Sequence, residues 1–231
     1  MPKLEGITVS VDYGDFLQEC LPYNKKHFDY YIVITSPKDQ HTQEICKKEG
    51  VDCLVTDAFY YGGTPFNKGL ALSLGLQRLK HNEWVIIHDG DTCLPFDLRD
   101  KLKLEKYNKE LMYGCSRKFI PTYKKWLECL KNKENFEKYE SIPGFGVGFY
   151  QLFHRQASVL KNIHPNEIYP SYPTAEMTDI AFLYRWCPPP HPKPEKLDFD
   201  CYHLSNCHGA AHSGRKNSKI NELKKPFKEM R

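Results

Sequence analysis

The stretch Trp84-Val85-Ile86-Ile87-His88-Asp89-Gly90-Asp91-Thr92-Cys93-Leu94-Pro95 decides the fold, because it joins a buried strand to a pair of acids. A short apolar run rich in β-branched residues is typical of a strand buried in a parallel sheet. Alternate side chains of an extended segment point the same way, so Asp89 and Asp91 are expected to converge on one cation. The alternative interpretation is a surface turn, because Asp-Gly pairs are common in turns.

The segments around this strand predict an alternation of strands and helices. Upstream, strands are expected at residues 6–11, 28–35 and 51–56, and helices at 16–23 and 40–49. Gly50 is expected to close the second helix, and Thr64 to cap a buried helix over residues 70–79. Downstream, helices are expected at 97–109, 124–139 and 174–186, and strands at 111–115, 149–153 and 199–204. This order indicates an α/β fold with a mostly parallel central sheet.

The composition is that of a soluble protein with one large domain. The chain has 231 residues, of which 40% are hydrophobic and 27% charged, and no run approaches the ~18 apolar residues of a membrane span. Its first residues lack the apolar core of a signal peptide, so a cytoplasmic protein is expected. The nine cysteines follow no regular spacing, which favours reduced thiols.

The C-terminal segment differs in charge from the rest of the chain. Residues 214–231 contain seven Lys or Arg and two Glu, a net charge of +5 in a chain whose formal net charge is +4. We therefore expect one domain over residues 1–213 and a basic tail over 214–231. Such a tail suits a polyanion such as DNA, and it is also an ordinary solubilising end.

Six segments occur in an order that resembles a known enzyme family. They are residues 7–12, 32–39, Asn67-Lys68-Gly69, His88-Asp89-Gly90-Asp91, 148–153 and 176–186. In this order they resemble the GT-A-fold glycosyltransferases that use nucleotide sugars, close to family 2 and to compact viral or phage members. The resemblance covers residues 6–215 and implies a single domain with a Rossmann-like sheet flanked by helices. The glycosyltransferase catalytic domain is thus expected to be residues 1–213.

The resemblance implies a set of donor-binding residues at the ends of the early strands and on a closing loop. They are Ser10, Asp12, Asp39, Asn67, Lys68, Asp89 and Arg215. Asp39 would bind the nucleotide base, although it also suits a helix N-cap because a helix is expected to begin at Gln40. A cation such as Arg215 would clamp the diphosphate.

The resemblance also implies a Mn²⁺ or Mg²⁺ ion that bridges the phosphates of a nucleotide-diphosphate sugar. Its expected ligands are Asp89, Asp91 and His203. A cation there would offset the negative charge that develops on the departing nucleoside diphosphate. A structural zinc site is the alternative for the cluster Cys201, His203, Cys207, His208 and His212, although its spacing matches no zinc module.

Asp179 stands where inverting members of the family have their catalytic base. A carboxylate there would take the proton from the attacking acceptor hydroxyl. Glu176, three residues earlier, is the competing candidate, and a solvated acidic helix face is the structural alternative. Glu176-Met177 replaces the Glu-Asp of many family-2 enzymes, so the motif does not fix the base.

The predicted function is a metal-dependent glycosyltransferase of the hexosyltransferase type, acting with inversion. Its acceptor is expected to be a glycan, a protein or a modified nucleic acid. A nucleotidyltransferase is one alternative, but Asp12-Tyr13-Gly14-Asp15 stands where that class would have a glycine loop with Arg or Lys. A non-catalytic module that binds sugar nucleotides or nucleic acid is the other.

Overall fold

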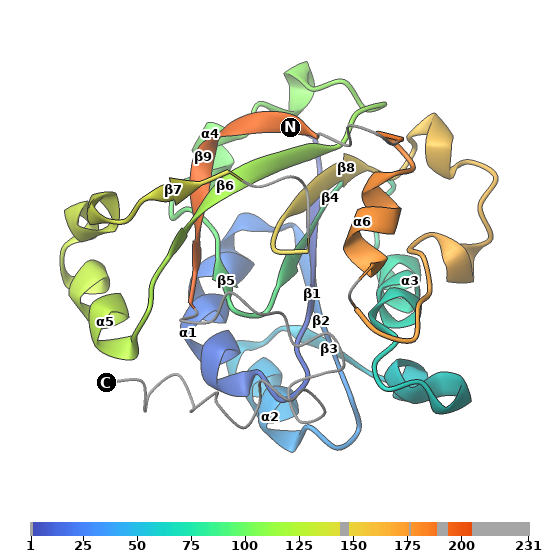
Figure 1. Cartoon of the computed structure of the whole chain (residues 1–231), viewed down its shortest axis with the longest axis horizontal. Coiled ribbons are helices and arrows are strands. Elements are labelled where there is room, and N and C mark those ends of the chain that lie inside the picture. The colour runs from blue at the N-terminus through green and yellow to red at the C-terminus, as the bar shows by residue number, and fades with distance from the viewer. Residues whose placement is uncertain (1, 144–147, 176, 189–193, 205–231) are drawn as a thin grey trace.

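Strand β4 (Trp84–Asp89) is an inner strand of the sheet and runs parallel to its neighbour β1 (Leu4–Val9), as Figure 1 shows. The computed structural model describes residues 2–143, 148–175, 177–188 and 194–204. Within these ranges nine strands form one sheet, in the order β3-β2-β1-β4-β8-β6-β9-β5, with β7 paired to β6. The predicted α/β fold, with a central sheet flanked by helices, is confirmed.

The sheet has a parallel half and a mixed half. Strands β1 to β4 are parallel to one another, whereas β8 runs antiparallel to both β4 and β6. Strand β9 is parallel to β6, and β5 and β7 are antiparallel additions to β9 and β6. The remaining bounds are β2 Tyr30–Thr35, β3 Asp52–Val55, β5 Thr92–Cys93, β6 Tyr113–Phe119, β7 Ser141–Ile142, β8 Gln151–His154 and β9 Glu195–His203.

Helices cover both faces of the parallel half, because the side chains of β2 alternate between two hydrophobic clusters. Ile32 and Ile34 pack with α3 (Lys68–Arg78) and α6 (Thr178–Leu183). Tyr31 and Val33 pack with α1 (Gly14–Asn24) and α2 (Gln40–Glu49) on the other face. The result is a three-layer arrangement with the parallel strands in the middle.

Helix ends match the sequence prediction where local signals are strong. Helix α2 begins after Asp39 and ends at Gly50, which has a φ of 65°. Thr64 does not cap α3, because its hydroxyl lies 3.1 and 3.0 Å from the carbonyl oxygens of Phe59 and Tyr61. Asn67 is the N-cap instead, and its side chain accepts the backbone N–H of Leu70 at 3.0 Å.

The helix predicted over residues 97–109 is wrong. Only α4 (Leu98–Lys101) and a 3₁₀ turn form there. Leu98, Leu102 and Leu104 are all buried in one cluster, whereas a continuous helix would place the third on a different face.

The other helices and 3₁₀ segments are α5 Tyr123–Lys131, η1 Lys25–His27, η2 Asp57–Gly63, η3 Leu104–Lys106, η4 Lys133–Lys138, η5 Ser158–Leu160 and η6 Pro165–Glu167.

The strand order reverses at β1, which places the candidate site. Strand β2 lies on one side of β1 and β4 lies on the other, so the connections from β1 and from β3 lead to opposite sides of β1. In open α/β sheets, ligands bind in the crevice that this reversal creates beyond the carboxyl ends of the strands. Asp12 follows the end of β1, and Asp89 and Asp91 lie at and just after the end of β4.

Among the described residues, no helix combines the length and the apolar character needed to cross a membrane. The predicted basic tail over 214–231 lies outside the described residues, so the division of the chain at residue 213 stays a prediction.

His88 supports the end of β4 from inside the protein. Its ring stacks on Tyr31 at 5.6 Å between centroids, and Tyr31 stacks on Phe28 at 4.8 Å. The Tyr31 hydroxyl donates to His88 Nε2 at 2.7 Å, and Nδ1–H donates to the backbone carbonyl of Asp89 at 3.0 Å, a tautomer assigned from these partners. Burial lowers the pKa of His88 to about 4.

We predict that the free energy of unfolding falls as the pH is lowered from about 6.5 towards 4. Unfolded histidine binds a proton in this range, whereas buried His88 does not. His27 and His154, whose pKa values burial also lowers, add to the effect with the same sign. His88→Gln should therefore reduce the slope of stability against pH in urea titrations without abolishing it. An unchanged slope would contradict this assignment.

Candidate functional site

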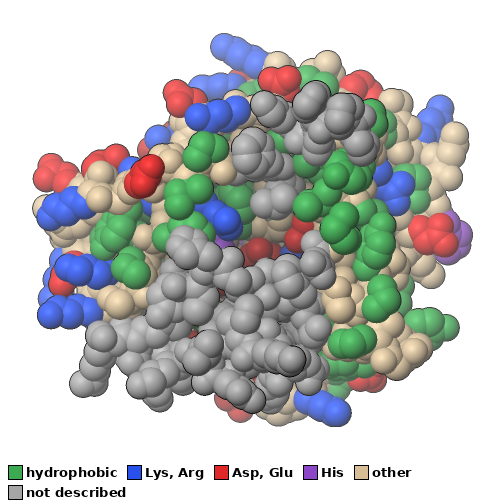
Figure 2. Space-filling view, in the orientation of Figure 1, with side chains coloured by type: hydrophobic (Ala, Val, Ile, Leu, Met, Phe, Trp, Pro, Cys, Tyr) green, Lys and Arg blue, Asp and Glu red, His purple; other side chains and the backbone are tan. Residues whose placement is uncertain are grey.

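The candidate site lies where the C-terminal ends of β1 and β4 meet. Ser10 follows β1, and its hydroxyl lies 3.3 Å from that of Thr42 on α2. Gly90 follows β4 and packs tightly against β1, since a Cβ there would lie 3.2 Å from the carbonyl oxygen of Val9. Figure 2 shows acidic side chains at the bottom of a hollow in the middle of this face.

Asp39 fastens the loop after β1 to the start of α2. Its Oδ1 accepts the backbone N–H of Thr42 at 3.1 Å, which confirms the predicted N-cap. Its Oδ2 accepts the backbone N–H of Asp12 at 2.7 Å and lies 3.2 Å from the hydroxyl of Thr35. Asp12 has a φ of 58°, a left-handed conformation that is uncommon outside glycine. The buried carboxylate of Asp39 therefore shapes the loop that carries Asp12.

Lys68, at the start of α3, joins two carboxylates that are far apart in the sequence. Its Nζ lies 2.9 Å from Oδ1 of Asp89, at the end of β4, and 3.1 Å from Oδ2 of Asp179, in α6. The Lys68 side chain is 8% exposed, so its charge requires partners. Burial alone would lower the pKa of Lys68, but the charges of Asp179 and Asp89 outweigh burial and raise the pKa above its usual value.

Tyr169, Gln151 and Gly148 complete the surroundings of Asp179. The Tyr169 hydroxyl lies 2.6 Å from Asp179 Oδ1 and 2.6 Å from Gln151 Oε1, and its single proton serves one of them at a time. Gln151 Nε2 donates to the backbone carbonyl of Asp179 at 3.1 Å. A Cβ at Gly148 would overlap Asp179 Oδ2 and lie 2.9 Å from Lys68 Nζ. A residue larger than glycine at position 148 would therefore displace the ion pair.

Asp91, His203 and Arg117 form a second cluster beside the first. His203 Nε2 lies 3.2 Å from Asp91 Oδ2, and Arg117 Nη1 lies 3.1 Å from His203 Nδ1. A guanidinium only donates, so Nδ1 accepts and the ring proton on Nε2 is donated to Asp91. The Arg117 guanidinium lies between the rings of Phe119 and Phe149, 4.6 Å from each centroid.

Arg117, Tyr169 and Gln151 are the residues that the sequence analysis missed. The sequence predicted a strand only over residues 111–115, so Arg117, which lies inside β6, gave no signal. Burial lowers the pKa of Arg117, and the negative charges of Asp89 and Asp91 oppose that change. This guanidinium therefore supplies a second positive charge close to both predicted acids.

The residues present fit a divalent cation that has few protein ligands. Asp91 and His203 supply an oxygen and a nitrogen that lie 3.2 Å apart. Mn²⁺ accepts such a mixed set, and Mg²⁺ commonly keeps waters and substrate phosphates beside one or two carboxylates. Within the described ranges no three His, Cys, Asp or Glu side chains form a ready metal site, since Asp89 turns towards Lys68. His203 would bind a cation through Nε2 only in the tautomer with its proton on Nδ1, which would end the hydrogen bond that Nδ1 accepts from Arg117.

Some predicted residues cannot be placed beside this site. Glu176 and Arg215 lie outside the described residues, as do Cys207, His208 and His212 of the predicted zinc cluster. The Sγ atom of Cys201 lies 3.3 Å from that of Cys115, and both cysteines are buried. The competing base, the diphosphate clamp and the zinc site therefore stay predictions.

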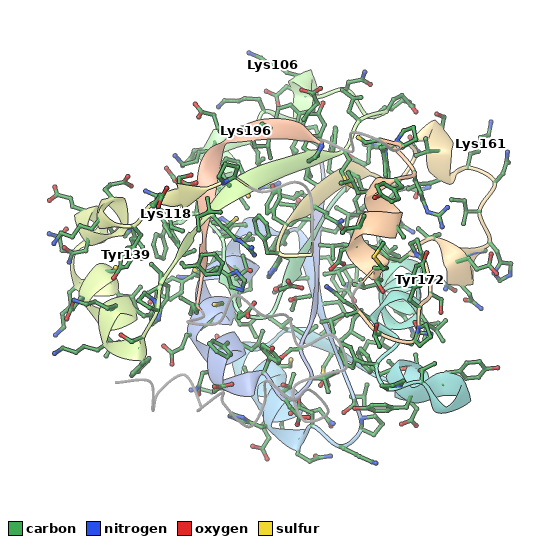
Figure 3. All side chains as sticks on the ribbon, viewed as in Figure 1. Lys106, Lys118, Tyr139, Lys161, Tyr172 and Lys196 are labelled. Atoms are coloured by element: carbon green, nitrogen blue, oxygen red, sulfur yellow. The ribbon has the colours of Figure 1, made fainter. Side chains whose placement is uncertain are left out.

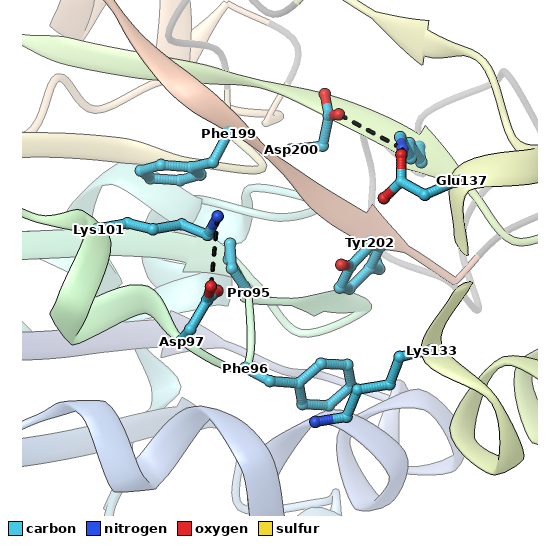
Figure 4. Close-up of a pocket in the computed structure, with 10 residues that line it drawn as sticks. Pro95, Phe96, Asp97, Lys101, Lys133, Glu137, Phe199, Asp200 and Tyr202 are labelled. Carbon is cyan, nitrogen blue, oxygen red and sulfur yellow. Dashed lines mark hydrogen bonds and ion pairs between the residues drawn. The ribbon is translucent and has the colours of Figure 1, made fainter. Parts of the chain in front are cut away.

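A cavity of about 450 Å³ lies elsewhere, between β9 and the loop after β5 (Figure 4). Most of its charged side chains pair with one another: Lys101 with Asp97 at 3.3 Å, and Lys118 with Glu137 at 2.7 Å and with Asp200 at 3.8 Å. Lys118 alternates along β6 with Arg117, so its side chain faces away from the candidate site. This cavity contains none of the predicted site residues.

We predict that Lys68→Met destabilises the protein, because Asp89 and Asp179 would lose their shared cation. Breaking a buried ion pair costs ~3–5 kcal/mol, and the loss here should be smaller because the Asp89 side chain is 34% exposed. Chemical denaturation of the parent and the variant at neutral pH measures this loss.

The matched control for this prediction is Lys125→Met. Lys125 pairs with Glu128 at 2.8 Å on the surface, and their side chains are 50% and 40% exposed. Exposed pairs contribute ~0–1 kcal/mol, so this variant should behave like the parent. Equal losses in the two variants would mean that Lys68 does not hold the site together.

Comparison with known proteins identifies the fold. No protein-family model matches the sequence, and a search of the curated proteins finds no match. A mycobacterial protein of known structure superposes with a TM-score of 0.57 at 13% identity, over 93% of this chain and 70% of its own. The glucosyl-3-phosphoglycerate synthase of M. tuberculosis superposes with a TM-score of 0.51 at 11% identity, over 91% of this chain and 74% of its own.

Two weaker matches have TM-scores too low to carry an argument. The same synthase in complex with Mn²⁺, UDP-glucose and phosphoglyceric acid superposes with a TM-score of 0.41 at 14% identity, over 69% of this chain and 58% of its own. The 4-diphosphocytidyl-2C-methyl-D-erythritol synthase of Anaerococcus prevotii superposes with a TM-score of 0.42 at 15% identity, over 67% of this chain and 72% of its own. At these identities a likeness concerns the fold alone. The chain has the Rossmann-like GT-A fold that the sequence predicts.

Proposed function

We propose that the protein is a metal-dependent glycosyltransferase that moves a sugar from a nucleotide-diphosphate sugar to an acceptor hydroxyl, with inversion. The observation that carries this proposal is the pairing of Lys68 with Asp89 and Asp179 at the reversal of strand order, beside the pair of Asp91 and His203. The fold shared with glucosyl-3-phosphoglycerate synthase supports it. The narrower kinship with family 2 and with compact viral or phage members belongs to the same proposal.

The donor would lie in the crevice between the ends of β1 and β4. Ser10 and Asp12 would line it on the β1 side, and Asn67 and Lys68 at the start of α3. Asp39 would contribute by holding Asp12 through the 2.7 Å bond to its backbone N–H. The missing side chain at Gly90 lets the chain after β4 pack closely against Val9 and Ser10 at this end of the crevice.

Asp91 and His203 would hold the divalent cation, and Asp89 would join them after release from Lys68. When bound, such an ion stabilises the negative charge on the departing nucleoside diphosphate. Arg117 would add a positive charge on the same side, because its guanidinium packs on the rings of Phe119 and Phe149 and donates to His203.

Asp179 would act as the catalytic base. Each carboxylate oxygen has two lone pairs, so Lys68 and Tyr169 can orient the group while another lone pair receives a proton. The acceptor oxygen would give its proton to Asp179 and form a bond to the anomeric carbon. The bond from that carbon to the phosphate oxygen would break, and the nucleoside diphosphate would leave with the electron pair.

Asp91→Asn should lower the Mn²⁺-dependent affinity for a nucleoside diphosphate at least about tenfold, because the amide lacks the charge that holds the cation. Calorimetry with UDP, GDP, CDP, dTDP and ADP, with and without Mn²⁺, would measure this. Asp100→Asn, an exposed carboxylate in α4, is the control and should bind as the parent does. Equal affinity of the parent and of Asp91→Asn for the nucleoside diphosphate would show that Asp91 does not hold the cation.

Asp179→Asn should lower kcat about 10²- to 10⁴-fold while the affinity for the donor changes less than about twofold, because the base acts in the transition state. Release of sugar from the donor, to water or to an acceptor, gives the rate. Tyr169→Phe keeps the carboxylate and loses one hydrogen bond, so its loss should be smaller. If Glu176→Gln shows the large loss instead, Glu176 is the base.

A further inference from the structure

Two loops beside Asp179 expose aromatic and apolar side chains. Among the described residues, six large hydrophobic side chains are well exposed, and four of them lie in residues 55–61 and 172–177. They are Val55, Tyr61, Tyr172 and Met177, with 42, 73, 38 and 44% of their surfaces exposed. We call Tyr61, Tyr172 and Met177 the tyrosine rim. A cluster of this kind marks a binding surface more often than a chance arrangement.

The two loops that carry the rim are tied to each other and to the start of α3. The backbone N–H of Phe66 donates to the carbonyl oxygen of Pro173 at 3.0 Å. Asn67 Nδ2 donates to Ser171 Oγ at 2.6 Å. Gly69 lies so close to the carbonyl oxygen of Pro170 that a Cβ would not fit between them. The rim is therefore held in place by bonds within the fold.

Backbone geometry keeps Tyr61 exposed. Gly62 and Gly63 follow it with φ values of 65° and 76°, a left-handed turn that other residues adopt at a cost. The chain thus turns back directly after Tyr61, while Phe59 and Phe66 of the same loop stack on each other at 5.1 Å in the interior.

Two residues of the rim, Tyr172 and Met177, lie close in the chain to the proposed catalytic base. Tyr169, three residues before Tyr172, bonds to Asp179 at 2.6 Å, and Met177 precedes Asp179 by two residues. Figure 3 places Tyr172 on the side of α3, and Figure 2 shows hydrophobic side chains gathered to the right of the acidic hollow. Tyr172 and Met177 therefore belong to the segment that carries Asp179 and its partner Tyr169.

The charge of these loops, which are bordered by Lys68 and Arg185, argues against one class of acceptor. Residues 56–67 and 168–184 contain no Lys or Arg and three acids, Asp57, Glu176 and Asp179. A nucleic acid strand requires cations along its phosphates, and these loops would repel it. Flat aromatic faces with few charges suit the apolar ring faces of a sugar, while hydroxyls of tyrosines supply hydrogen bonds.

We propose that the tyrosine rim binds the acceptor and that the acceptor is an uncharged glycan. This inference rests on the proposed function, since it assigns the rim to the acceptor side of the same reaction. Tyr61 and Tyr172 would each carry one stacking contact, and Asp179 would meet the hydroxyl that the bound sugar presents.

The test is binding to a panel of immobilised uncharged oligosaccharides, compared with a DNA duplex and a Ser/Thr-rich peptide, at 50 and 300 mM salt. The parent should bind at least one oligosaccharide with little dependence on salt. The Tyr61→Ala/Tyr172→Ala variant should lose that binding by about tenfold or more. Leu127→Ala is the matched control, because Leu127 is 37% exposed on α5, away from the rim, and it should bind as the parent does.

Donor binding separates this inference from the proposed function. The double variant should bind the nucleoside diphosphate with Mn²⁺ as the parent does. If the parent binds the nucleotide but no oligosaccharide, or if the double variant loses binding to DNA or peptide instead, the glycan assignment is wrong and the proposed function stands. If the parent binds no nucleotide under any condition, the proposed function itself fails.

Discussion

The charge of Lys68 is the constraint on which the site depends. A buried ammonium needs partners, and here the partners come from the end of β4 and from α6, on either side of α3. The three elements meet only if α3 packs against the sheet with its first turn at the strand ends. The ion pairs therefore select one placement of α6, and with it the position of Asp179. Gly148 shows how closely the chain packs there, because even a methyl group would disturb the pair.

The two halves of the sheet supply different parts of the site. The parallel half brings Ser10, Asp12 and Asp89 to one edge, because parallel strands end on the same side. The mixed half supplies His203, which β9 places beside Asp91 because it pairs with β5 at Thr92, and Arg117, which contacts His203 from the neighbouring strand β6. The candidate cation site therefore depends on both halves, because Asp91 follows β4 whereas His203 and Arg117 come from β9 and β6.

The parts of the fold and of the candidate site that could be predicted are those whose sequence signals lie within a few residues of one another. Strand β4 and helix α2 follow from an apolar run, from the Asp39 cap and from the Gly50 turn, all within a few residues. The prediction of an N-cap at Thr64 was wrong: it relied on the proline that follows, whereas the true cap at Asn67 is visible only from its bond to Leu70. The Arg117 cluster joins residues 86 positions apart and rests on long-range register, which no local pattern encodes. Glu176, Arg215 and the basic tail lie outside the described residues, so those predictions remain as the sequence left them.

The balance of charge bears on how a donor would enter. Asp89, Asp91 and Asp179 carry three negative charges, and Lys68 and Arg117 two positive ones, so these five groups are close to neutral together. A nucleotide-diphosphate sugar carries two negative charges and a divalent cation two positive ones, so the pair would add no net charge. Under the proposed function, the donor alone would bring the charge of these five groups from −1 to −3, which is costly in a partly buried site, whereas donor and cation together would leave it at −1. The cation would then enter before or with the donor, and Asp89 would exchange Lys68 for it while Lys68 keeps Asp179 as its partner.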